Sequence, residues 1–192
     1  MSKRALLVID VQNDYFSGPM TITYPPGSFG KILRAMDGAK EAGVPIVMIQ
    51  TAIPRPDAKV FKKGTPGWAL HSEVARRHYD VFNHNELPGS FTGTNLEQWL
   101  REHEIDTVTI CGYMTQMCDD KTSRQAVHLG FAVEFLSDAT GTLAFKNAAG
   151  EVTAEELHRA VLVVQQSRFS NVLTTEAWLK NLGTPAVAAK GF

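Results

Sequence analysis

The amino-acid sequence predicts an α/β fold built around a mostly parallel sheet. Short apolar, β-branched runs alternate along the chain with segments of helical periodicity, which is typical of βα units. Most of the apolar runs are nearly continuous, as expected for strands that helices cover on both faces. The chain has 192 residues, of which 44% are hydrophobic and 20% charged. We therefore expect a single domain over residues 1–192, with a tail from about residue 183.

The first part of the chain predicts two strands, one helix and two long loops. The apolar run "ALLVID" indicates a strand at 5–10, and "PIVMIQT" indicates another at 45–51. A segment of helical pattern around 30–42 lies between them. The connections 11–29 and 52–72 contain Pro and Gly, and loops of this length often carry a site.

The middle of the chain continues the same alternation. Strands are expected at 80–84 ("DVFNH"), 107–112 ("TVTICG") and 132–138 ("AVEFLSD"). Helices are expected around 93–104 and 116–129, and "NLEQWLREH" in the first of these places its apolar residues on one helical face. This order of elements favours helices that connect neighbouring parallel strands.

The last part of the chain predicts one helix, one strand and a tail. Thr153 and Glu156 open the helix expected around 153–167, and their spacing is that of a capping box. A sixth strand, "SNVLTT", is expected at 170–175. We expect the final stretch, "GTPAVAAKGF", to be a surface tail or a contact with a partner chain.

Composition and charge exclude several classes of protein. A formal net charge of −1 gives no electrostatic footprint for nucleic acid or an anionic membrane. Two cysteines, Cys111 and Cys118, are too few for a disulfide framework and suit a reducing compartment. The N-terminal stretch "MSKRALLVID" has too short an apolar run for a signal peptide or a membrane span. We therefore expect a cytoplasmic protein without nucleic-acid or membrane partners.

Three polar segments follow predicted strands, and their positions indicate where a site forms. In a doubly wound sheet, ligands bind beyond the carboxyl ends of the strands, at the switch in strand order. The segments "VIDVQNDYF", "NHNELPGSF" and "GYMTQMC" all reach such an end. Asp10 closes the first apolar run, where a carboxylate serves either as a turn or cap residue or as a catalytic group.

Cys118 is the candidate nucleophile. If Thr115 is the N-cap of the following helix, Cys118 is its N3 residue, with the sulfur near the positive end of the helix. That field lowers the pKa of a thiol, and free backbone N–H groups there can hold an oxyanion. The neighbouring acids Asp119 and Asp120 oppose a thiolate, so an inert, buried Cys118 is an equally valid interpretation. For Cys111, inside its strand, we expect the inert role.

The sequence resembles the isochorismatase-like cysteine hydrolases in three motifs. These motifs are "LLVIDVQNDYF", "LPGSFTGTNLEQWL" and "GYMTQMCDDKTSRQA", and the resemblance runs from about Ala5 to Trp178. It implies a Rossmann-like three-layer α/β/α sandwich with a mostly parallel six-stranded sheet. Amidohydrolases of this family use an Asp–Lys–Cys triad, which implies that Asp10 is the general base and Cys118 the nucleophile.

The resemblance also implies an oxyanion hole and a pocket. The family has a non-proline cis peptide before the nucleophile's helix, here between Tyr113 and Met114. The backbone N–H groups of Met114 and Cys118 would then form the oxyanion hole. Phe16, Trp68, Tyr113 and Met114 are candidate walls of the substrate pocket, although each is also compatible with core packing.

The sequence departs from the family at the triad lysine. That lysine normally stands six residues before the Phe of the "SF.GT" motif, which here is Phe91, so its position holds Asn85. An asparagine forms hydrogen bonds but carries no charge, and the site loses the cation that steadies a thiolate and a base. The sequence is compatible with a natural asparagine and with one introduced to trap substrate. Other cations could replace the charge: Lys63, Lys62, Lys121 and His84, although strand alternation turns His84 away from Asn85.

These observations predict a hydrolase that cleaves an amide-like C–N bond of a small molecule through a thioester-type intermediate. The alternative is a weak or inactive relative that binds a small ligand, because of Asn85. A nicotinamidase would need an Asp/His metal cluster after the second strand, yet "TAIPRPDAKVFKKG" offers only Asp57. Isochorismate cleavage is disfavoured because those relatives generally lack the cysteine. We expect no metal and no cofactor, and, by resemblance, a homo-oligomer.

Overall fold

The computed structural model describes residues 2–186 and contains one six-stranded sheet in which every neighbouring pair of strands is parallel. The strand order is β3-β2-β1-β4-β5-β8, so the order reverses between β1 and β4. The predicted α/β fold with six main strands is confirmed. Their bounds are β1 (Arg4–Ile9), β2 (Ile46–Thr51), β3 (Val81–Asn85), β4 (Thr107–Tyr113), β5 (Ala132–Gly141) and β8 (Asn171–Leu173).

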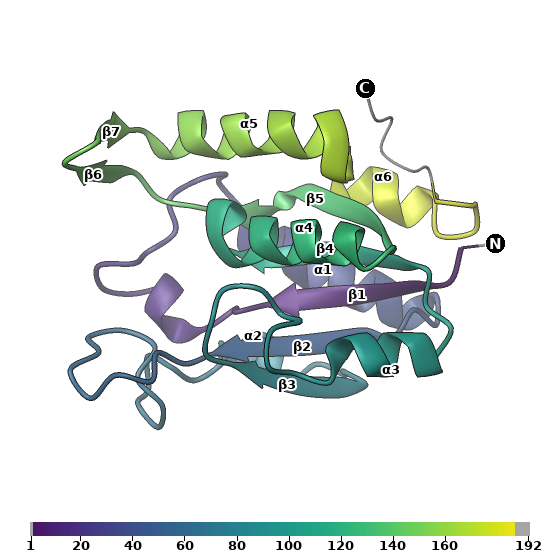
Figure 1. The fold of residues 1–192 in the computed structure, drawn as a ribbon, viewed down its shortest axis with the longest axis horizontal. Helices are drawn as coiled ribbons and strands as arrows, with labels where there is room; N and C mark the ends of the chain where they lie inside the picture. The colour runs from purple at the N-terminus through teal and green to yellow at the C-terminus, as the bar shows by residue number, and fades with distance from the viewer. Residues whose placement is uncertain (1, 187–192) are drawn as a thin grey trace.

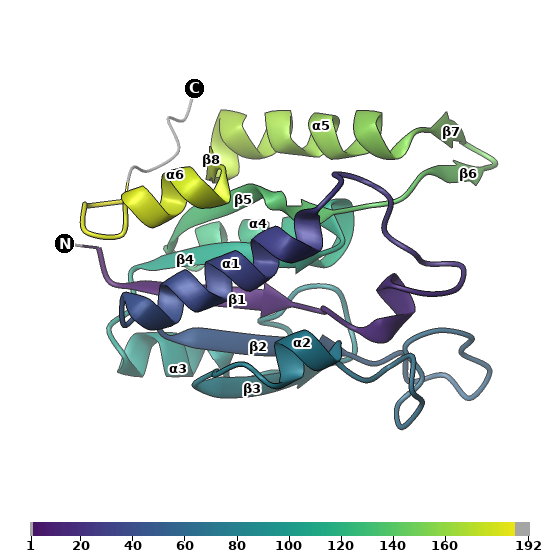
Figure 2. The ribbon, with the colours of Figure 1, turned by 180° about the vertical axis from the view of Figure 1, so that it is seen from behind.

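Helices cover both faces of the sheet (Figure 1, Figure 2). One apolar cluster joins the sheet to α1 (Ser28–Glu41), α2 (Ser72–Ala75) and α6 (Thr175–Lys180). The opposite cluster joins it to α3 (Leu96–Glu102) and α4 (Asp120–His128). Successive residues of β1 alternate between the two clusters, because strand side chains point alternately to opposite faces. This two-sided burial explains the continuous apolar run of β1.

Helix α5 (Ala154–Val164) begins with the predicted capping box, which is confirmed. The Thr153 side chain accepts a hydrogen bond from the Glu156 N–H at 3.2 Å, and the Glu156 carboxylate accepts one from the Thr153 N–H at 3.1 Å. A π-helical turn, η3 (Gln165–Phe169), follows the helix.

Several elements were not predicted. Residues 145–147 and 150–152 pair as an antiparallel hairpin of β6 (Phe145–Asn147) and β7 (Gly150–Val152), and η1 (Asn13–Tyr15) is a short 3-10 helix. The strand predicted at 170–175 extends beyond the observed end of β8, which is Leu173. Thr174 caps α6 by accepting a hydrogen bond from the Ala177 N–H at 3.2 Å, so the chain turns into a helix after Leu173.

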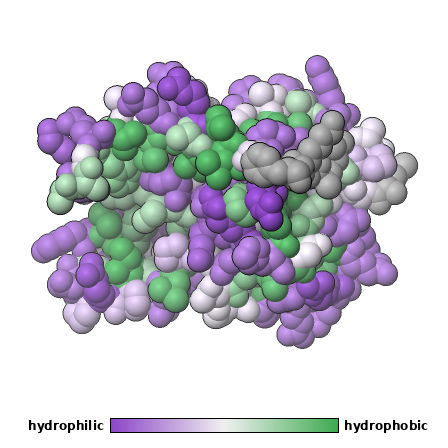
Figure 3. Space-filling model, turned by 45° about the horizontal axis from the view of Figure 1, so that its top comes forward, coloured by the Kyte–Doolittle hydropathy of each residue, from purple (hydrophilic) through white to green (hydrophobic). Residues whose placement is uncertain are grey.

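Helix α5 leaves apolar side chains at the surface. Val163 is 64% exposed and Val164 43% exposed. Figure 3 looks toward the α5 side of the molecule and shows apolar surface interspersed with hydrophilic side chains. The homo-oligomer stays a prediction. Within residues 2–186, no helix combines the length and the hydropathy that a membrane span requires.

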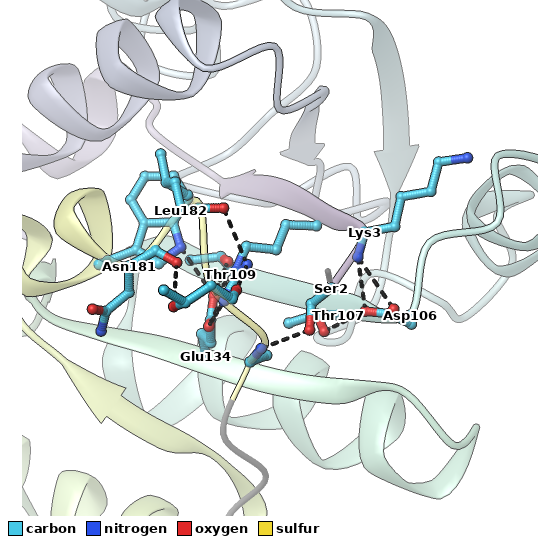
Figure 4. Close-up of polar contacts among 12 residues, drawn as sticks. Ser2, Lys3, Asp106, Thr107, Thr109, Glu134, Asn181 and Leu182 are labelled. Atoms are coloured by element: carbon cyan, nitrogen blue, oxygen red, sulfur yellow. Dashed lines mark hydrogen bonds and ion pairs between the residues drawn. The ribbon is translucent and has the colours of Figure 1, made fainter.

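A buried ion pair joins the start of the chain to β5 (Figure 4). The Arg4 guanidinium donates to the Glu134 carboxylate from Nε at 3.0 Å and from Nη2 at 2.9 Å, and both side chains are 2% exposed. Thr109 Oγ1 and Trp178 Nε1 donate to the same carboxylate at 2.9 and 3.0 Å. These four hydrogen bonds satisfy the Glu134 carboxylate, whose negative charge is buried in the protein interior.

The same arginine holds the beginning of the predicted tail. Arg4 Nη1 donates to the Thr184 carbonyl at 2.8 Å, and the Ala186 N–H donates to Ser2 Oγ at 2.6 Å. Thr184 and Ala186, at the beginning of the predicted tail, therefore contact the N-terminal segment of this same chain. Residues 187–192, the rest of the predicted tail, lie outside the described residues.

Candidate active site

The candidate site lies at the carboxyl ends of the central strands, where the long loops also gather (Figure 1). Asp10 is the first residue after β1 and is 1% exposed. Its φ of 52° lies in the left-handed region, which aspartate tolerates better than most side chains. Its N–H donates to the Ile49 carbonyl at 3.0 Å, and this bond holds the residue beside β2.

Cys118 reaches the same place from β4. Gly112 permits a close approach of β4 to β1, because a Cβ there would lie 2.0 Å from the Ile9 carbonyl oxygen and its φ is 127°. The peptide between Tyr113 and Met114 is cis. The chain then enters the π-helical turn η2 (Thr115–Asp119), which carries Cys118 and leads directly into α4.

The predicted capping role of Thr115 is wrong. The turn is capped by Met114, and Thr115 is its first residue, so Cys118 is the fourth residue and not N3. The Thr115 hydroxyl instead forms a hydrogen bond with His158 Nδ1 of α5, 2.9 Å away. This long-range contact draws the hydroxyl away from the backbone of its own turn, and a local cap does not form.

Asp10, Asn85 and Cys118 converge in one buried cluster, and Thr51 connects them. The Thr51 hydroxyl lies 2.9 Å from Asp10 Oδ2 and 2.6 Å from Asn85 Oδ1. Asn85 Nδ2 donates to the Leu87 carbonyl at 3.1 Å. Within residues 2–186, Asp10 Oδ1 has no hydrogen-bond partner, and the Cys118 thiol lies close enough to the Asp10 carboxyl group to influence its pKa.

Burial controls the ionisation of the cluster. It raises the pKa of Asp10 to about 7, although hydrogen bonds with Cys118 and Thr51 offset part of the shift. Burial, and next the negative charge of Asp10, raise the pKa of Cys118 well above its ordinary value. The resting site therefore favours a neutral Cys118 thiol over a preformed thiolate. This thiol faces the Asp10 carboxyl group, which titrates near neutral pH.

No cation neutralises the cluster within the described part of the chain. The ion pairs between residues 2 and 186 do not include Asp10. Of the four cations considered as substitutes, Lys63 and His84 line a cavity beside Asn85. Lys62 instead donates from Nζ to the Pro56 carbonyl at 3.2 Å, and Lys121 is exposed on α4.

This cavity has a volume of about 530 Å³ and opens at the ends of β2 and β3. Trp68 and His84 stack in its wall, with ring centroids 5.8 Å apart and planes 15° apart. His84 is exposed, whereas Asn85 is 4% exposed, as strand alternation predicts. Burial and the charge of Lys63 lower the pKa of His84, so its neutral form is favoured. The cavity therefore combines a flat aromatic wall with one lysine.

The structure separates Trp68 from the other predicted pocket residues. Phe16 and Tyr113 line a different hollow of about 280 Å³, and the Tyr113 hydroxyl lies 3.2 Å from Ser28 Oγ. Met114 is 3% exposed and lines neither cavity. Only Trp68 of the four predicted wall residues lies in the cavity that contains Asn85.

Two residues of the cluster escaped the sequence analysis. Thr51 is the polar last residue of an apolar strand, which is a weak signal for a site. Asp119 was considered only as an acid that opposes a thiolate, but it is fully buried and neither carboxyl oxygen has a partner among the described residues. Burial, followed by repulsion from Asp10, raises the pKa of Asp119 well above its usual range, which favours its protonated form.

Within residues 2–186, no group of three or more His, Cys, Asp or Glu side chains is arranged to hold a metal ion. A nicotinamidase-type metal cluster therefore has no counterpart in this part of the chain.

Brief treatment of the native protein with substoichiometric iodoacetamide should label Cys118 and spare Cys111. Cys118 is 6% exposed, whereas Cys111 is fully buried with its sulfur 3.6 Å from the Leu7 carbonyl oxygen. Because the pKa of Cys118 is raised, its labelling rate should increase steeply toward alkaline pH. Peptide mass spectrometry measures both sites, and preferential labelling of Cys111 would contradict the assignment.

The chain is similar to proteins of one family over nearly its whole length. A family model described as the isochorismatase domain matches residues 4–177. An uncharacterized isochorismatase family protein of Bacillus subtilis, YddQ, is 32% identical over 92% of this chain and 98% of its own. The ureidoacrylate amidohydrolase RutB of Methylobacterium radiotolerans is 24% identical over 97% of this chain and 82% of its own.

The chain is also similar to a solved structure over nearly its whole length. A Burkholderia xenovorans protein named for the isochorismatases superposes with a TM-score of 0.94 at 46% identity, over 98% of this chain and 92% of that chain. The similarity therefore includes all six strands of the sheet and the segments that carry Asp10, Asn85 and Cys118.

Proposed function

This chain belongs to the isochorismatase family of hydrolases, and we propose that it cleaves an amide-like C–N bond of a small molecule with Cys118 as the nucleophile. The observation that carries the proposal is the Cys118 thiol facing the Asp10 carboxyl group at the carboxyl ends of the strands. A nucleophile within hydrogen-bond reach of a base is the arrangement that covalent catalysis requires. The amidohydrolase name of the similar RutB protein supports an amide as the substrate class.

The proposed reaction has two steps, acylation of Cys118 and hydrolysis of the thioester. After the second step the enzyme is back in its starting form. Asp10 accepts the thiol proton while the Cys118 sulfur attacks the carbonyl carbon, and the C–N bond then breaks as Asp10 gives the proton to the leaving nitrogen. Water attacks the resulting thioester, with Asp10 again accepting a proton, and the carboxylic acid departs as the thiol re-forms. A base with a pKa of about 7 is matched to this work near neutral pH.

The oxyanion of each tetrahedral intermediate would be held by backbone N–H groups. The candidates are those of Met114, after the cis peptide, and of Cys118, in the turn η2. Preorganised donors of this kind stabilise the charge that develops on the carbonyl oxygen. Trp68 and Lys63, in the cavity beside Asn85, would contact the part of the substrate that does not react.

A second candidate is a weak or inactive relative that binds a small ligand. Asn85 favours it, because no cation pairs with Asp10 in residues 2–186 and the pKa of the Cys118 thiol is raised. Such a protein would keep the cavity and bind small molecules without turnover.

Incubation with a panel of small primary amides, ureido compounds and activated esters tests the proposal. Release of the amine, ammonia or alcohol is measured together with the intact mass of the protein after a rapid acid quench. We expect product release and a transient acyl adduct on the Cys118 peptide. Ligand binding in calorimetry without product or adduct, across the whole panel, would support the inactive relative instead.

Replacing Asn85 with lysine should lower the pKa of the Cys118 thiol and raise the rate of hydrolysis. A full charge beside a partly desolvated sulfur shifts its pKa by about 1–3 units, and one electrostatic stabiliser is worth on the order of 10²-fold in rate. The measurements are the pH dependence of Cys118 alkylation and turnover of the best substrate. Asn85→Gln is the matched control, because it lengthens the side chain without adding charge. Equal titration of the lysine variant and the natural protein would mean that another group already supplies the charge.

A further inference from the structure

The Thr51 hydroxyl lies within hydrogen-bond distance of two oxygen atoms, each of which can accept its proton. Asp10 Oδ2 lies 2.9 Å away and Asn85 Oδ1 lies 2.6 Å away. A hydroxyl group has one proton and can donate it to only one acceptor at a time. One of the two contacts must therefore obtain its hydrogen from another atom.

The orientation of the Asn85 amide decides whether the Thr51 proton goes to Asn85 or to Asp10. Asn85 Nδ2 donates to the Leu87 carbonyl at 3.1 Å. Turning the amide over would bring Oδ1 against that carbonyl and leave two acceptors facing each other. Asn85 therefore presents its oxygen, which can only accept, to Thr51. The shorter contact receives the Thr51 proton, and the Asp10 contact needs a proton of its own.

The three residues cannot easily move apart. Thr51 and Asn85 are register partners in the β2–β3 ladder. The Thr51 N–H donates to Gln12 Oε1 at 3.0 Å, and Gln12 Nε2 donates back to the Thr51 carbonyl at 3.0 Å. Gln12 is fully buried just after Asp10. These bonds fix the distance between the Thr51 hydroxyl and both of its neighbours.

We infer that Thr51 is a positioning residue through which Asn85 holds a proton on Asp10 Oδ2. In the resting state the Asp10 carboxyl donates to Thr51, and Thr51 donates to Asn85. When Asp10 ionises, the Thr51 hydroxyl turns to donate to the carboxylate, and Asn85 Oδ1 loses its donor. Asn85 thus opposes the ionised form of Asp10, and its effect is transmitted by one hydroxyl group. The catalytic consequence rests on the proposed role of Asp10 as the base.

The other titratable groups around Asp10 remain unchanged in the test. Cys118 and Asp119 face it from η2, and Tyr15 faces it from η1. Lys63 and His84 lie in the cavity wall beside Asn85. None of these residues is substituted. Because the Thr51 hydroxyl also bonds with Cys118, the Asn85 substitution, made with and without the hydroxyl, isolates the effect of Asn85 on Asp10.

A double-mutant cycle tests the inference. Carbon-13 NMR of the aspartate carboxyl groups follows Asp10 with pH in the substrate-free protein, with Asp10→Asn to assign the signal. Asn85→Leu should lower the midpoint by about one pH unit, because Thr51 is then free to donate to the carboxylate. Thr51→Val should raise it by a similar amount, because the carboxylate loses its donor. Thr51→Ser keeps the hydroxyl and should titrate as the natural protein does.

The double variant gives the decisive result. Asn85→Leu should have almost no effect on the Asp10 midpoint when Thr51 is already valine, because its effect needs the hydroxyl. An equal effect in both backgrounds, or none in the natural background, overturns the inference. Thermal melting checks that each variant is folded, and Asn85→Ala replaces Asn85→Leu if the latter is not.

The titration also separates this inference from the proposed function. Shifts as expected in a protein that hydrolyses nothing would reject the function and keep the coupling. An acyl adduct on Cys118 with an unshifted Asp10 midpoint in Asn85→Leu would keep the function and reject the coupling. In an active protein, the ascending limb of the kcat/KM profile should move with the NMR midpoint.

Discussion

Replacing Cys118 with alanine is expected to abolish hydrolysis while leaving the fold and the cavity intact. Of the two cysteines, both within the described residues, Cys118 is the one that influences Asp10, and Cys111 is fully buried. Removing the nucleophile of such a catalytic unit costs on the order of 10⁴-fold or more in kcat. Steady-state turnover of the best substrate measures the loss, and calorimetry measures the substrate binding that should remain.

Cys111→Ala is the matched control for this variant. It makes the same substitution in the strand that leads to the site, and Cys111 is fully buried with its sulfur 3.6 Å from the Leu7 carbonyl oxygen. Its turnover should stay within a few fold of the natural protein, although the core loses some packing. If both variants keep full activity, the nucleophile is not a cysteine, and the proposed mechanism is wrong.

Replacing Glu134 with glutamine is expected to lower the free energy of unfolding by about 3–5 kcal/mol. The substitution keeps the shape of the side chain but leaves the Arg4 charge without its partner, 2% exposed in the protein interior. The contacts in Figure 4 show that several parts of the chain depend on this carboxylate. Urea denaturation at pH 7 measures the change.

A second ion pair provides the control. Lys3 and Glu104 are also 2.9 Å apart, but their side chains are 53% and 83% exposed. Because solvent screens an exposed pair, Glu104→Gln should change the free energy of unfolding far less than Glu134→Gln does. Equal losses in the two variants would mean that burial does not set the strength of the Glu134 contact. Adding Arg4→Met to Glu134→Gln should recover part of the loss, since no unpaired charge then remains.

The strands and the first two members of the site could be predicted from the sequence. A strand covered on both faces must be apolar at nearly every position, so β1, β2 and β4 are visible as continuous runs. A polar residue directly after such a run lies at the carboxyl edge of a parallel sheet, which is where Asp10 and the turn with Cys118 are found. The capping box at Thr153 is equally local, because its partners are three residues apart.

The contacts between distant segments were decided by the tertiary structure alone. Thr51 enters the site because the β2–β3 register sets it opposite Asn85, and 34 residues separate the two in the chain. His158, 43 residues away, engages Thr115 and prevents the local cap. Register and helix placement follow from the packing of the whole sheet, which periodicity within one segment does not encode.

The sequence by itself determined that Asp10 and the segment with Cys118 follow predicted strands, and its family resemblance places Asn85 at the position of the triad lysine. It could not determine their charge states, because a pKa depends on burial and on the few atoms that face each group. Only the folded chain withdraws Asp10 from water, sets Cys118 against it and places the Thr51 hydroxyl between Asp10 and Asn85. Residue identity specifies which groups can react, and packing specifies which of them hold the protons.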